Sequence, residues 1–144
     1  MKDDFKRILV GVDDSEDALA AFQYAIHRAK ADHAELVIAS VLESGEMNVY
    51  QALTKDYVHG ERVELQEHIE RYVRLAQQAG IKSVQAVIGE GDAGETIIKK
   101  IIPQVQPDLL VIGAMSKRGI ARHFGSQAAY MAKYAAISVL VVRD

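Results

Sequence analysis

The chain has no cysteine and no tryptophan among its 144 residues. Without cysteine, neither disulfide bonds nor thiolate metal sites are available, which fits the reducing cytosol. No apolar run approaches the roughly 20 residues of a membrane-spanning helix. The first ten residues, MKDDFKRILV, carry charges where a secretory signal would be apolar. We therefore expect a cytoplasmic protein with no membrane association.

Acidic residues are missing from one long stretch. Between Leu109 and Arg143 there is no Asp or Glu, whereas five Lys or Arg residues occur there. The chain as a whole has a formal net charge of −3, so the remaining residues sum to −8. A positive region on an otherwise acidic protein indicates a small anionic ligand. The lack of a Lys/Arg-rich tract argues against general nucleic-acid binding.

Short apolar runs alternate with amphipathic segments. Strands are predicted at residues 7–12, 35–42, 83–88, 109–112 and 138–142. Helices are predicted at residues 16–31, 57–79, 95–105 and 126–136. This alternation predicts a Rossmann-like α/β fold in one domain over residues 1–144, a five-stranded parallel sheet doubly wound with helices on both faces.

Three details of the helices are predicted from single residues. Asp14 or Ser15 is expected to cap the first helix, and Gly80 to end the second. Pro103 is expected to kink the third helix or end it early. The buried stripe of the first helix is expected to contain Ala18, Leu19, Phe22, Ala25, Ile26 and Ala29.

Ligands of such sheets bind beyond the carboxyl ends of the strands, where the strand order reverses. The strands at 7–12 and 109–112 are both strongly apolar, so we expect them to be central neighbours. The loops that follow them, Asp13-Asp14-Ser15 and residues 113–126, would then face one crevice.

The segment at 113–126 has the order of a phosphate-binding loop: strand, glycine loop, helix N-terminus. Gly113 would let a ribose or phosphate approach the backbone closely. The amides of Gly125, Ser126 and Gln127 would hold phosphate oxygens, helped by the helix dipole. Four further loop residues could screen a triphosphate: Lys117, Arg118, Arg122 and His123. Alternatively, the glycines only end a strand and start a helix on a solvent-exposed loop.

A second glycine pattern, Gly89, Gly91 and Gly94, formally spells the dinucleotide fingerprint. Glu90 and Asp92 would confront a pyrophosphate with like charge, and the next strand ends without the acid that should bind a ribose. We interpret the segment as a turn followed by a helix cap, with Asp92 near the helix start.

The order of these motifs resembles the universal stress protein family over essentially the whole chain. The matching segments are RILVGVDDSE, ELVIASV, GEGDAGETI, PDLLVIGA and the closing Gly-Ser, helix and SVLVVRD. ATP-binding members carry Gly-x2-Gly-x9-Gly-Ser/Thr after the fourth strand. Gly113 matches the first glycine and Gly125-Ser126 the closing pair. Ser116 replaces the second glycine, and the spacer is one residue shorter, as in a branch considered nucleotide-binding.

The resemblance implies an adenine nucleotide alpha hydrolase-like fold that binds ATP, or a related adenine nucleotide, with Mg²⁺ or Mn²⁺ able to bridge the phosphates. Asp13 matches the acidic residue at the adenosine end, where a carboxylate accepts from the exocyclic amine or a ribose hydroxyl. Val41 matches a position that packs against the base. For Asp13 the alternative is helix capping, and for Val41 core packing. The other candidate contacts are Gly11, Val12, Ile112, Gly113, Met115, Ser116, Gly125, Ser126 and Gln127.

The last strand, Ser138–Val142, would expose unpaired backbone groups at a sheet edge. Antiparallel pairing with a second copy would cover it, and the resemblance implies the same homodimer; the alternative is an internally covered strand.

The predicted function is a dimeric, ATP-binding stress-response module. The alternatives are a dimeric interaction protein of the same fold that binds no nucleotide, and a slow ATP hydrolase or nucleotidyl transferase.

Overall fold

The computed structural model describes residues 4–13, 15–43, 55–114 and 125–144, with the backbone alone for 55–62. Five strands form one sheet in the order β3-β2-β1-β4-β5. Their bounds are β1 Arg7–Gly11, β2 Glu35–Leu42, β3 Val84–Glu90, β4 Leu109–Gly113 and β5 Ser138–Val142. Every neighbouring pair is parallel, which confirms the predicted sheet.

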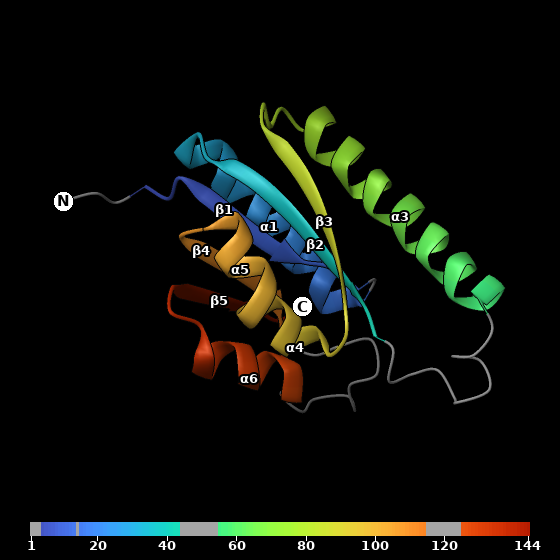
Figure 1. The fold of residues 1–144 in the computed structure, drawn as a ribbon. Helices are drawn as coiled ribbons and strands as arrows, with labels where there is room; N and C mark the ends of the chain where they lie inside the picture. Colours follow the sequence, from blue (N-terminus) through green and yellow to red (C-terminus); the bar gives the residue numbers. More distant parts are fainter. Residues whose placement is uncertain (1–3, 14, 44–54, 115–124) are drawn as a thin grey trace.

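Helices cover both faces of this sheet (Figure 1). Their bounds are α1 Glu16–Asp32, α3 Lys55–Gln78, α4 Ala93–Thr96, the π-helical η2 Ile97–Ile101, α5 Ile102–Val105 and α6 Ser126–Tyr134. One core cluster joins α1 and α3 to the sheet through residues such as Phe22 and Tyr72. The other joins η2 and α6 to the opposite face through residues such as Ile101 and Met131. The predicted double winding is therefore confirmed.

The buried side of α1 differs from the predicted one at Leu19, which is 42% exposed. The stripe that packs on the sheet repeats every three to four residues through Ala18, Ala21, Phe22 and Ala25. Leu19 lies about 100° around the helix from Ala18 and points away from that stripe. Leu19 and Ala18 are both apolar, so their hydrophobicity could not indicate which of the two is buried.

Pro103 does not end the third helical segment early, which corrects that part of the expectation. The helical run continues from Ala93 to Val105, but its middle five residues are π-helical, and the Ile102 N–H bonds to the Ile97 carbonyl. Pro103 is the second residue of α5, directly after the π-helical residues, and as a proline it has no N–H to donate within the run. The change of hydrogen-bond pattern before Pro103 thus accommodates it.

Asp32 ties the N-terminal segment to the end of α1. Its side chain is 2% exposed, and Oδ2 accepts the Phe5 N–H and the Arg28 Nε–H, each at 2.9 Å. Burial opposes ionisation, but these hydrogen bonds and the Arg28 charge outweigh it, so the pKa of Asp32 is lowered. A lowered folded-state pKa means that the carboxylate stabilises the fold above the unfolded-state pKa, near 3.9, and that this stabilisation is lost as the pH falls through the folded-state pKa.

We expect Asp32→Asn to reduce the free energy of unfolding at pH 7 by about 1–3 kcal/mol, because the amide cannot replace two charge-assisted hydrogen bonds. The difference from the parent protein should shrink as the pH is lowered below about 4. Urea unfolding at pH 7 and at pH 3 measures both, with Glu67→Gln on the exposed side of α3 as the control. An equal loss at the two pH values would contradict the assignment.

Candidate functional site

The carboxyl ends of β1 and β4 lie side by side in the middle of the sheet (Figure 1). Val10 on β1 is in register with Val111 on β4. From this pair the chain leaves in opposite directions, because β2 and β3 extend the sheet on one side and β5 on the other. The predicted central pairing and the predicted reversal of strand order are both confirmed, and this side of the sheet is called the carboxyl edge below.

The loop after β1 places Asp13 at the carboxyl edge. Its side chain is exposed, and Oδ1 accepts the Ser15 N–H at 3.0 Å. Ser15, not Asp13, caps α1, because its Oγ accepts the Ala18 N–H at 3.1 Å. Asp14 lies outside the described residues. The capping alternative for Asp13 is therefore wrong. Its carboxylate instead stabilises the turn that follows β1.

Gly113 packs closely against the first turn of α1. A Cβ at Gly113 would lie 2.7 Å from the Ala18 backbone N and 2.7 Å from the Asp17 carbonyl carbon. Position 113 must therefore lack a side chain, because the first turn of α1 packs directly on the end of β4. This contact fixes the position of the loop that carries Asp13.

Three other predicted contacts have side chains that belong wholly or partly to the core, and a fourth is a glycine. Val12 and Ile112 are 7% and 3% exposed, and each packs in one of the two core clusters. Only their backbones reach the carboxyl edge. Val41 is half-buried against the second cluster, as the packing alternative predicts. Gly11 lies beside η2, where a Cβ would lie 3.5 Å from Ile97 Cδ1.

The helix that follows the glycine loop begins at the same edge. Gly125 has the extended backbone of an N-cap, and its own N–H bonds to the Ala114 carbonyl at 2.8 Å. The expectation that the Gly125 amide holds phosphate is therefore corrected, since this donor is already used. Ser126 and Gln127 form the first turn of α6, where amides have no intrahelical acceptor. Ser126 is exposed.

The side chain of Gln127 reaches across to the segment after β3. Its Oε1 accepts the Gly94 N–H at 2.7 Å, and its Nε2 donates to Asp92 Oδ1 at 2.9 Å. Asp92 caps α4 by accepting the Glu95 N–H, and Gly91 takes a positive φ of 127°. The second glycine pattern is thus a turn followed by a helix cap, as interpreted from the sequence.

The end of the chain is also held at the carboxyl edge. Asp17, in the first turn of α1, is 5% exposed, and its Oδ1 accepts the Asp144 N–H at 2.9 Å. The Ala114 N–H bonds to the Val142 carbonyl at the end of β5. Sequence reasoning did not single out Asp17, whose only sequence signal was an acidic residue early in a helix. Met115, Ser116, Lys117, Arg118, Arg122 and His123 lie outside the described residues.

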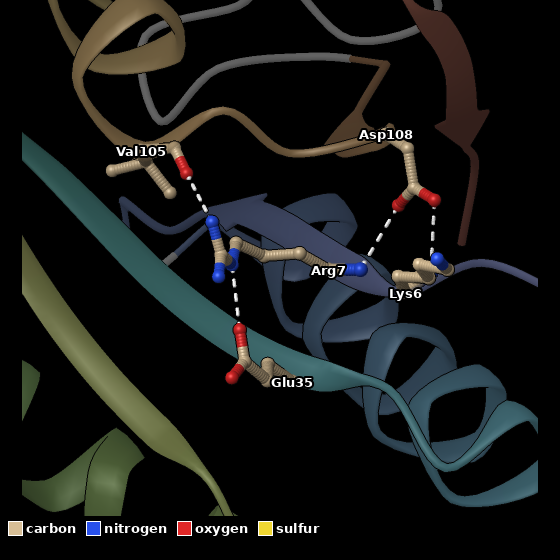
Figure 2. Close-up of polar contacts among 5 residues, drawn as sticks. All are labelled: Lys6, Arg7, Glu35, Val105 and Asp108. Carbon is tan, nitrogen blue, oxygen red and sulfur yellow. Dashed lines mark hydrogen bonds and ion pairs between the residues drawn. The ribbon is translucent and has the colours of Figure 1, made fainter.

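A second polar cluster lies at the opposite, amino edge of the sheet (Figure 2). Arg7 on β1 pairs with Glu35, its register partner on β2, and donates to the Val105 carbonyl. Asp108 accepts the backbone N–H groups of Lys6 and Arg7. These contacts surround an open cavity of about 450 Å³. Through these contacts Arg7 and Asp108 tie the start of β1 to β2, to the end of α5 and to the segment before β4.

Among residues 4–13, 15–43, 55–114 and 125–144, no helix is long and apolar enough to cross a membrane. The same part of the chain holds no group of three or more His, Cys, Asp or Glu side chains placed to bind a metal ion.

Comparison with known proteins gives a consistent picture. The family model described as the universal stress protein family matches residues 4–143. A "Putative universal stress protein" of Staphylococcus aureus strain USA300 is 29% identical over 140 residues, which cover 96% of this chain and 84% of that protein. The structure of the universal stress protein UspA from Lactobacillus plantarum superposes with a TM-score of 0.87 at 23% identity, covering 99% of this chain and 100% of the other.

Two similar structures carry nucleotides. A universal stress protein in complex with cAMP has a TM-score of 0.73 at 24% identity, covering 97% of this chain and 98% of the other. An Arabidopsis thaliana universal stress protein family protein with AMP bound has a TM-score of 0.69 at 19% identity, covering 96% of this chain and 91% of the other. At these identities the likeness establishes the fold alone.

Proposed function

Because this chain belongs to the universal stress protein family, we propose that it is a cytoplasmic, dimeric stress-response module that binds ATP or a related adenine nucleotide between the loops after β1 and β4. The observation that carries the proposal is the pairing of β1 with β4. It brings an exposed carboxylate, Asp13, and the first turn of α6 to one edge of the sheet. Similar folds hold cAMP or AMP.

The phosphates would bind at the first turn of α6. The Ser126 and Gln127 amides lie where a helix has no acceptors of its own, and the helix dipole favours negative charge there. The Ser126 hydroxyl adds a donor. No Asp or Glu occurs between Leu109 and Arg143. The carboxylate that reaches this turn from outside the stretch, Asp92, accepts hydrogen bonds from Gln127 Nε2 and the Glu95 N–H. A divalent cation, Mg²⁺ or Mn²⁺, would accompany a triphosphate and take most of its ligands from phosphate oxygens and water.

The adenosine end would bind beside β1. Asp13 is exposed at the end of that strand, and a carboxylate accepts hydrogen bonds from a ribose hydroxyl or an exocyclic amine. The half-buried Val41, at the end of β2, offers an apolar surface to a base. Gly11 and the backbones of Val12 and Ile112 complete this end of the proposed site.

The dimer would form through β5. This strand is an edge of the sheet, and Val139, Leu140, Val141 and Val142 are all half-buried in a single copy. Antiparallel pairing with β5 of a second copy would satisfy the edge backbone groups and bury these side chains in an isologous interface.

One measurement tests the ligand and the dimer together. Native mass spectrometry of freshly purified protein should show two 15.8 kDa chains carrying one adenine nucleotide each, identified after denaturation. A pair of chains that takes up no nucleotide, even with added Mg·ATP, would favour the interaction-protein alternative. Recovery of ADP after ATP is supplied, at a rate abolished by Ser126→Asp, would favour the hydrolase alternative.

A further inference from the structure

The two hydrogen bonds of the Gln127 side chain join two helix N-termini. Gln127 begins α6, and the Gly94 N–H that it accepts belongs to the first turn of α4. Asp92 completes a closed ring of contacts, because one of its oxygens caps α4 and the other accepts from Gln127 Nε2. The first turn of α4 therefore depends on where α6 begins.

A side chain at position 94 would displace the tip of the Gln127 side chain. A Cβ there would lie 2.6 Å from Gln127 Oε1 and 3.1 Å from Tyr130 Cδ1. Gly94 is buried, and its amide has Gln127 as its acceptor. A shift of the first turn of α6 must consequently move or break this contact, since a packed interface of this kind does not deform gradually.

The helical run that starts at this contact leads back to the other side of the proposed site. Three residues after Gly94 the run becomes π-helical, and Ile97, the first π residue, is buried beside Gly11 at the end of β1. Single π-helical turns inside helices are frequent at functional positions. The run thus touches both the start of α6 and the strand end that precedes Asp13.

We propose that Gln127 is a positioning residue that couples the phosphate end of the nucleotide site to the helical run from Ala93 to Val105. The inference rests on the proposed nucleotide function. A phosphate held by the Ser126 and Gln127 amides restrains the first turn of α6. Through Gln127 it restrains the Gly94 amide, and through the run it holds Ile97 against the end of β1. The surface of this run then reports nucleotide occupancy to a partner.

Hydrogen exchange measured with and without saturating Mg·ATP tests the coupling. In the parent protein, peptides covering residues 93–101 should exchange about fivefold more slowly with ATP, the lower end of typical coupling energies. In Gln127→Met the protection of these peptides should disappear, while ATP still binds. Coupling is reciprocal, so ATP affinity should fall by about the same factor, which a higher ATP concentration overcomes.

Two further variants make the outcome decisive. Gly94→Ala pushes the contact apart from the α4 side and should abolish the same protection, which keeps the test available if Gln127→Met does not fold. Gln104→Met, an exposed glutamine in α5, should leave the protection intact. ATP binding without protection in the parent protein, or protection that survives in Gln127→Met, overturns the coupling alone. No ATP binding to the parent protein overturns the proposed function and the coupling with it.

Discussion

Gly113→Ala should destabilise the protein by about 2–3 kcal/mol although it adds a single methyl group, because overpacking against a rigid neighbour carries a penalty of this size. The new Cβ would lie 2.7 Å from two backbone atoms of α1, the Ala18 N and the Asp17 carbonyl carbon. Backbone at the start of a capped helix cannot give way as the tip of a side chain can. The strain must therefore displace the first turn of α1 or the end of β4.

Gly11→Ala is the matched control, since it makes the same change on the neighbouring strand at the same edge. Its Cβ would lie 3.5 Å from Ile97 Cδ1, an ordinary contact with a side-chain methyl group. We expect the free energy of unfolding to change by less than about 0.5 kcal/mol. Urea unfolding of both variants measures the difference, and equal effects would refute the packing role given to Gly113.

This prediction separates two interpretations of the same glycine. If Gly113 admitted a ligand, Gly113→Ala would lower ATP affinity and leave the stability of the free protein unchanged. In the structure the glycine packs against α1, whose N-terminal cap Ser15 follows the turn made by Asp13. A loss of affinity in Gly113→Ala should accordingly come with a loss of stability, not replace it.

The strands of the sheet could be predicted because each one is indicated by the pattern of its own residues. Residues 8–10 of β1 and 109–112 of β4 are continuously apolar, and such runs are typical of strands that are buried on both faces of a sheet. The strands β2 and β5 have the predicted bounds, and the others differ by one or two residues. The pairing of β1 with β4 followed from which two strands were most apolar, since the centre of a doubly wound sheet is its most covered part.

Several of the missed features depend on contacts between distant segments. Gln127 bonds to Asp92 and Gly94, more than 30 residues away in the sequence. Asp17 meets the backbone of Asp144 across nearly the whole chain. Neither residue stands out by type or spacing, because a polar side chain near a helix start is ordinary. The hydrogen bond of the Gly125 amide could not be predicted for the same reason, because its acceptor, the Ala114 carbonyl, lies on the other side of the glycine loop.

Ser126→Asp should lower ATP affinity by about 100-fold while leaving the fold at least as stable. The variant places a carboxylate beside the amides proposed to hold the phosphates, and like charges about 4 Å apart repel by roughly 1–4 kcal/mol in and near water. The same carboxylate is favourable to the helix, because negative charge at an N-terminus stabilises α6 by about 0.3–1 kcal/mol. Affinity and stability thus move in opposite directions, which misfolding cannot imitate.

Ser126→Asn supplies the neutral side chain of the same shape and should keep ATP affinity within about threefold, since it preserves a polar group and adds no charge. The loss in Ser126→Asp should grow with the number of phosphates, from none for adenosine to the full effect for ATP, as calorimetric titration can show. Whether the loss of affinity grows with the number of phosphates decides where the phosphates bind. A loss that is equal for adenosine and ATP would place the phosphates elsewhere, and unchanged ATP binding would leave the first turn of α6 as a structural element alone.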